Sequence, residues 1–138
     1  MPANNPCARV VREWKSKADQ DFKAISLLLK NREVAPLEVI CFHAQQGAEK
    51  YLKALLVSHG FEVPKTHDLR RVIALLPPGS RPGQTPEELL LLTTYATTFR
   101  YPGDQGPMTL NEARSVVRPA RSIRQWAREC LSARKSIE

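Results

Sequence analysis

Apolar residues in the first part of the chain recur at spacings of three and four, the period of a helix that buries one side. The first run predicts a helix over about residues 9–31. Its apolar positions are Trp14, Ala18, Phe22, Ile25, Leu28 and Leu29. Ala35-Pro36 predicts the start of a second helix, because proline is accepted in a first helical turn. That helix is expected to end near His59, since Gly60 is a typical residue just past a helix end.

Apolar spacing and end signals predict three further helices. A short one over about 68–76 ends at a proline pair. The next, over about 86–98, opens with Thr85 and Glu88 as a capping box. The last runs over about 110–134 behind a second capping box, and Pro119 inside it is expected to kink or locally break the helix.

No segment shows the alternation of a strand, and no repeat stands out. We therefore expect an all-α fold, an up-and-down antiparallel bundle of four long helices plus one short helix. At 138 residues the chain predicts a single domain over 1–138, with flexible ends at 1–8 and 135–138.

The second helix has a small-residue side and a polar side. Gly47 on the first costs about 1 kcal/mol relative to alanine inside a helix, so we expect a packing reason for it. The polar side contains His43, Gln46, Glu49, Lys50 and Lys53. It is either a solvated face, with Glu49 supporting Lys53 one turn later, or a polar interface that binds an anion.

Charge adds a second feature to the helical pattern. The chain has 21 basic and 14 acidic residues, a net charge of +7, which favours an anionic partner. The charge does not choose among nucleic acid, a nucleotide, an acidic protein and an anionic membrane surface. Five arginines of the last helix share one side and form a basic stripe: Arg114, Arg118, Arg121, Arg124 and Arg128. The stripe is either a solvated face or a surface that binds phosphates without reading bases.

Several functional classes lack their signatures. The three cysteines are widely spaced without a CxxC pair, and Cys41 with His43 has no matching second pair, so we predict no metal site and no cofactor. Phosphate-loop, dinucleotide-binding and hydrolase motifs are absent. Without a long apolar stretch or a secretory leader, the chain is expected to be cytoplasmic and not bound to a membrane.

Four blocks of sequence together resemble the HEPN family, the nucleotide-binding domain of higher eukaryotes and prokaryotes. The blocks are KADQDF at 17–22, FHAQQGAEKYLKALL at 42–56, PKTHDL at 64–69 and FRYP at 99–102, in order over about residues 9–131. The resemblance implies a helical bundle that is frequently a homodimer. It also implies a nucleotidyltransferase as protein partner, in a two-component system like that of a toxin and its antitoxin.

Many HEPN proteins are metal-independent ribonucleases with an arginine followed, four to six residues later, by a histidine. In this chain His43, His59 and His67 do not follow an arginine at that spacing. We therefore expect a non-catalytic module that binds a nucleotide. The alternatives are a ribonuclease toxin whose rearranged site uses Arg100 and His67, and a purely structural dimerisation module.

The resemblance implies a polar pocket for the nucleotide. Its candidate residues are Lys50 and Lys53 on the second helix, His67 in the following linker, and Arg100 and Tyr101 after the fourth helix. In the competing structural interpretation, Arg100 and Glu49 form an ion pair inside the bundle.

Overall fold

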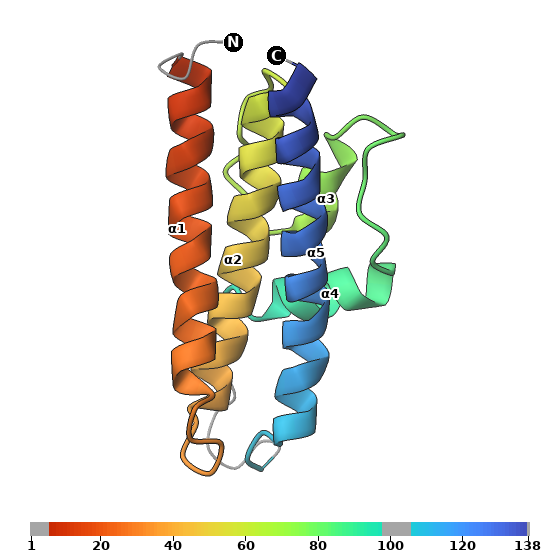
Figure 1. The fold of residues 1–138 in the computed structure, drawn as a ribbon. Coiled ribbons are helices and arrows are strands. Elements are labelled where there is room, and N and C mark those ends of the chain that lie inside the picture. The colour runs from red at the N-terminus through yellow and green to blue at the C-terminus, as the bar shows by residue number, and fades with distance from the viewer. Residues whose placement is uncertain (1–5, 98–105, 138) are drawn as a thin grey trace.

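The computed structural model describes residues 6–97 and 106–137, the last three for the backbone alone, and every regular element in these ranges is an α-helix. Three helices are long and two are short. Figure 1 shows the long helices side by side, with the short ones packed against them. The elements are α1 (Pro6–Leu28), α2 (Leu37–Ser58), α3 (Leu69–Ala74), α4 (Pro86–Thr94) and α5 (Leu110–Ile137). The predicted all-helical class is thus confirmed.

The directions of the helices differ in part from the predicted up-and-down bundle. α1 and α2 are antiparallel, but α5 runs in the same direction as α2, and α4 lies across the long helices (Figure 1). α4 has 9 residues and ends at Thr94, so it is short where a long helix was predicted. No glycine or proline marks this end in the sequence, and the apolar run beyond it, with Tyr95 and Ala96, continues as a buried turn.

α2 is the centre of the core, because it packs on both other long helices and its apolar residues are buried on nearly every side. α1 and α5 each supply one apolar stripe, as their spacing predicted. A Cβ atom on Gly47 would lie 2.5 Å from the Cε2 atom of Phe22. The missing side chain therefore lets α1 approach α2 closely, which is the packing reason expected for this glycine.

The predicted helix ends are confirmed where side chains or a left-handed glycine form them. Gly60 has a φ of 80°, and the amide of Phe61 donates to the carbonyl of Leu56 at 3.0 Å, which closes the end of α2. Thr85 and Glu88 form the capping box of α4. Asp68 caps α3 by accepting a hydrogen bond from the backbone amide of Arg70.

α5 continues as one helix through Pro119, so of the predicted kink or local break, the break is wrong. Its last turn holds the end of α2, since the Nη2 atom of Arg134 donates to the carbonyl of Ser58 at 2.7 Å. In the ranges that the structure covers, no helix combines the length and apolar character needed to cross a bilayer.

Candidate functional site

Two buried carboxylates, one on α1 and one on α2, organise the polar side of α2, and we call this region the α1–α2 seam. The first is Asp21 on α1. Its Oδ1 atom lies 2.8 Å from the Nδ1 atom of His43, and its Oδ2 atom accepts a hydrogen bond from the Nζ atom of Lys50 at 2.8 Å. One carboxylate thus holds two polar side chains of α2 against α1.

The second carboxylate is Glu49 on α2, whose side chain is only 5% exposed. It accepts hydrogen bonds from Lys53 Nζ at 2.9 Å and Gln45 Nε2 at 2.9 Å, and His67 Nδ1 lies 2.8 Å from its Oε1 atom. Burial alone would raise the pKa of Glu49, but the hydrogen bonds from Gln45, Lys53 and His67 outweigh it and lower the pKa. Glu49 is therefore held in its ionised form.

Lys53 is a structural partner of this network. Its side chain is 7% exposed, and its ammonium group lies 5.8 Å from the ring centroid of Trp14 on α1. The predicted support of Lys53 by Glu49 one turn earlier is confirmed. Of the two interpretations of this polar side, the solvated face does not hold for these two residues, because Trp14 on α1 and the loop before α3 cover them. Lys50 is similarly held by Asp21.

His67 is the exposed end of the Glu49 network. Its side chain is 55% exposed, and its backbone carbonyl accepts a hydrogen bond from Gln45 Nε2 at 3.2 Å. With the proton on Nδ1, the ring donates to Glu49, and Nε2 is the nitrogen left for another partner. In the neutral ring this Nε2 can accept a proton, and in the doubly protonated ring it can donate a hydrogen bond to a phosphate oxygen.

Arg100 and Tyr101 fall in 98–105, outside the described residues. Their predicted place beside His67, and the predicted ion pair of Arg100 with Glu49, therefore stay predictions. In the described structure Glu49 is held by Lys53, Gln45 and His67.

The remaining histidine, His59, lies at the end of α2. Its ring stacks on Phe61 with the centroids 5.8 Å apart. Burial and the nearby charge of Arg134 lower the pKa of His59, so the neutral ring is favoured. This histidine stabilises a helix end and lies apart from the α1–α2 seam.

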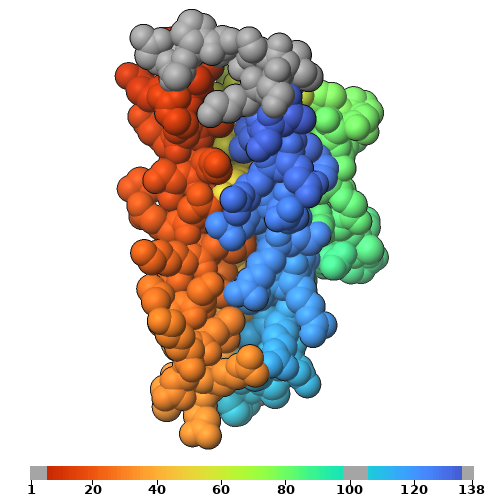
Figure 2. Space-filling view, in the orientation of Figure 1, coloured from red at the N-terminus to blue at the C-terminus, as the bar shows by residue number. Residues whose placement is uncertain are grey.

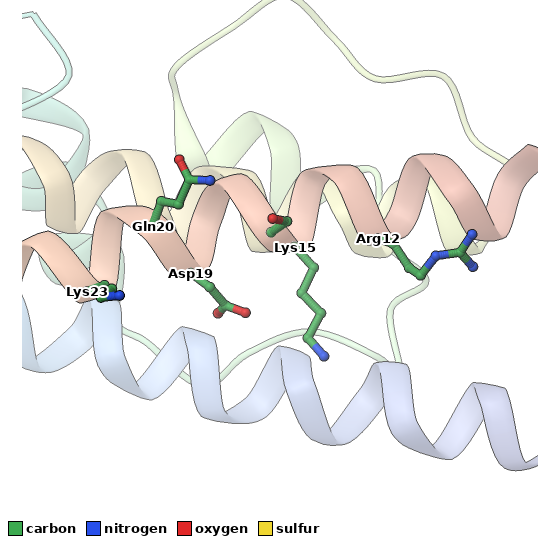
Figure 3. Close-up of a pocket in the computed structure, with 6 residues that line it drawn as sticks. Arg12, Lys15, Asp19, Gln20 and Lys23 are labelled. Carbon is green, nitrogen blue, oxygen red and sulfur yellow. The ribbon is translucent and has the colours of Figure 1, made fainter.

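A second polar region separates α1 from α5. Figure 2 shows the two helices side by side on one face of the molecule. A cavity of about 370 Å³ opens along α1, and we call it the α1–α5 groove. Its lining residues are Arg12, Lys15, Ser16, Asp19, Gln20 and Lys23. In Figure 3 the side chains of Lys15 and Asp19 extend from α1 toward α5.

One cluster of side chains bridges the α1–α5 groove. Arg124 Nη2 donates to Asp19 Oδ1 at 3.1 Å, and its guanidinium lies 5.0 Å from the ring centroid of Phe22. Tyr51 on α2 also donates a hydrogen bond to Asp19. Burial and this hydrogen bond raise the pKa of Tyr51 to about 12, so its hydroxyl stays protonated as the donor.

The basic stripe of α5 keeps most of its arginines at the surface. Arg118, Arg121 and Arg128 are exposed, whereas Arg114 and Arg124 are half-buried. Of the five, Arg124 alone has a carboxylate within ion-pair distance among the described residues. On the opposite side of α5 the apolar residues are buried, as Ala120, Ile123 and Ala127 show.

A family model described as the HEPN domain matches residues 11–130, most of the chain. This chain belongs to the HEPN domain family. The predicted resemblance is thereby confirmed, and the HEPN match includes the seam and the groove. Among curated proteins and solved structures, none matches the chain.

The described part of this HEPN domain contains no group of three metal-ligating side chains that could hold an ion. Cys41 is buried, and its Sγ atom lies 3.7 Å from the sulfur of Met108. The neighbouring His43 is turned to Asp21 instead. The C-x-H pair is therefore part of two separate contacts.

Sequence reasoning assigned no role to Asp19 or Asp21. A signal for Asp21 was present, because it follows Ala18 by three positions and precedes Ile25 by four, which places it on the buried side of its helix. An acidic residue there requires a cationic partner. Asp19 carries no such signal, since its partner Arg124 lies 105 positions away.

Proposed function

We propose that this HEPN protein is a non-catalytic subunit that binds a nucleotide at the α1–α2 seam and partners a nucleotidyltransferase in a toxin–antitoxin-like system. The observation that supports it best is the Glu49 network. It commits Lys53 to an internal ion pair, and it presents His67 at the surface in a fixed orientation. An oriented imidazole beside a basic surface suits the phosphate of a nucleotide.

The proposed site is completed by Arg100 and Tyr101, as the family resemblance implies. Arg100 would pair with the phosphate, and Tyr101 would pack against the base. Lys50 contributes from the edge of the seam, where its side chain is 23% exposed while it holds Asp21. Lys53 contributes through Glu49, as a positioning residue.

The test is a calorimetric titration of the full chain with ATP, GTP, CTP and UTP. We expect one nucleotide to bind, and both Arg100→Ala and His67→Ala to weaken binding about tenfold or more, the loss typical of one charged contact. His59→Gln is the matched control, because this histidine lies apart from the seam. Absence of binding by all four nucleotides, or binding that neither variant changes, contradicts the proposal.

The partner and the dimer are tested on the same protein. We expect a nucleotidyltransferase encoded beside it to co-purify with the chain. Sedimentation equilibrium is expected to give twice the chain mass of 15.6 kDa. A monomer at micromolar concentration contradicts the homodimer, and separate elution of the two proteins contradicts the partnership.

One observation favours a second candidate, a metal-independent ribonuclease. The Glu49–His67 pair resembles the carboxylate–imidazole arrangement of a general base. A metal-free assay of RNA cleavage distinguishes the two functions. Cleavage that disappears in folded His67→Ala and Arg100→Ala protein makes the chain an enzyme, whereas no cleavage, or cleavage that both variants retain, supports the binding module.

A further inference from the structure

The α1–α5 groove is polar where two neighbouring helices of a bundle ordinarily bury apolar side chains. Its lining residues on α1 are spaced by three and four and so form one continuous side of that helix. α1 and α5 both pack on α2, and each already has its own buried apolar stripe. The residues on the groove side of α1 therefore do not form part of the hydrophobic core.

The charge of the groove is strongly positive. The lining has three cations, Arg12, Lys15 and Lys23, against one carboxylate, Asp19. That carboxylate is already occupied by Arg124 and Tyr51. Lys15 and Lys23 have no carboxylate within ion-pair distance among the described residues.

α5, which lies beside the groove, adds further positive charge. Arg121 and Arg128 lie three and four positions from Arg124, so they share its side of the helix and are exposed. A second copy of this chain would bring the same cations to the groove, and like charges would oppose its docking there. The complementary occupant is an anion that carries several charges in a row.

We propose that the α1–α5 groove is a binding site for linked phosphates, a chemistry shared by the triphosphate of a nucleotide and the backbone of a nucleic acid strand. Lys15 and Lys23 bind phosphate oxygens as point charges, and the guanidinium of Arg124 binds them as a planar fork. The cations along α1, from Arg12 to Lys23, lie 11 positions apart at their ends, about 16 Å of helix, which is longer than a single phosphate.

Among the described lining residues, Asp19 is the carboxylate that competes with a phosphate for Arg124, and it thereby regulates this site. It holds Arg124 over the Phe22 ring in the described structure. An arriving phosphate takes the guanidinium from the carboxylate, while Asp19 keeps the hydrogen bond from Tyr51. The site is separate from the α1–α2 seam, and the inference does not rest on the function proposed there.

The test measures binding of a labelled 12-residue uridine RNA by fluorescence anisotropy, and binding of inorganic tripolyphosphate directly by calorimetry. The variant Lys15→Gln with Lys23→Gln removes two groove cations. Lys17→Gln with Arg70→Gln is the matched control, because it removes the same charge from exposed positions outside the groove. Thermal unfolding checks that all variants are folded.

We expect the groove variant to weaken RNA binding about tenfold more than the control does. The slope of log affinity against log salt should become shallower by about 1.4, the value for two lost contacts to a single strand. Asp19→Asn should strengthen binding, because it removes the competing charge and leaves an acceptor for Tyr51. A purely structural Asp19 would give no such gain.

The two arms distinguish the source of the phosphates. Loss of both RNA and tripolyphosphate binding in the groove variant supports a site open to a strand. Loss of tripolyphosphate binding alone supports a site for the phosphates of a free nucleotide. If the groove variant and its control bind both probes equally well, the proposal is overturned. This conclusion does not depend on whether the α1–α2 seam binds a nucleotide in the calorimetric titration.

Discussion

The α1–α2 seam and the α1–α5 groove use the same charged residue types on neighbouring sides of one helix, with opposite results. In the seam, Asp21 and Glu49 are nearly covered, and they bind Lys50, Lys53 and two histidines. In the groove, Asp19 is 38% exposed and several cations outnumber it. Burial of the carboxylate, more than the presence of the cation, therefore decides whether a basic residue stabilises the fold or remains available to a ligand.

The largest expected effect comes from removing the carboxylate of the seam. Glu49→Ala leaves Lys53 buried without a partner, and we expect a loss of about 3–5 kcal/mol in the free energy of unfolding. Urea denaturation measures it.

The matched variant for this prediction replaces both partners with apolar residues. Glu49→Leu with Lys53→Met should recover most of the loss, because no charge is left buried. An exposed ion pair contributes up to about 1 kcal/mol to the free energy of unfolding. If Glu49→Ala loses less than that, the buried pair does not stabilise the seam, and the seam does not differ from the groove in this respect.

A smaller effect is expected from closing the space that lets α1 approach α2. Gly47→Ala places a methyl group against the Phe22 ring, and overpacking of this kind costs about 1–3 kcal/mol. The better helix propensity of alanine offsets about 1 kcal/mol of that cost. We expect a net loss of stability in urea denaturation.

Gly79→Ala is the control for the glycine prediction, because a Cβ atom there meets nothing within 4 Å. Its effect should stay within about 0.5 kcal/mol. Phe22→Leu in the Gly47→Ala background should relieve part of the strain. If the single variant Gly47→Ala is as stable as the natural protein or more stable, the contact between α1 and α2 can accommodate a methyl group and is not tightly packed there.

The smallest effect is a dependence of stability on pH. The pKa of Glu49 is lowered in the folded protein from its ordinary value of 4.5, so the unfolded chain binds this proton first. Its contribution is fully present above that value and is lost as the pH falls through the folded pKa. Urea midpoints measured from about pH 6 to about pH 3 follow the loss.

Glu49→Gln provides the reference for the pH experiment, since it cannot titrate. The stability difference between the natural protein and Glu49→Gln should be constant near neutrality and shrink in acid. A difference that stays constant down to about pH 3 contradicts the lowered pKa of Glu49.

The helical period and the helix ends could be predicted because both depend on residues that are close together in the chain. Thr85 caps α4 through Glu88, three positions later, and Gly60 ends α2 through its own backbone conformation. The end of α4 lacks such a local signal, and its length was overestimated. The direction of α5 was also missed, because it depends on the path of the whole connection from α2.

The charged sites were predicted less completely because their partners lie far apart in sequence. The position of Glu49 on its own helix does not show that the loop carrying His67 covers it. The α5 stripe was visible as a repeat of arginines, but the α1 wall of the groove requires knowing that Asp19 and Arg124 meet across 105 positions. The spacing of residues along one helix does not indicate which side chains an element distant in sequence will bury.

The shared direction of α2 and α5 gives the bundle an electrical polarity of its own. Peptide dipoles of parallel helices add, and α1, running the other way, cancels only one of the two. Partial negative charge gathers at the end where Ser58 and Arg134 meet, and there the guanidinium donates to the last carbonyl of α2. The backbone of the bundle thus carries a net dipole whose direction is set by the path of the chain. Exchange of surface side chains leaves this backbone dipole in place.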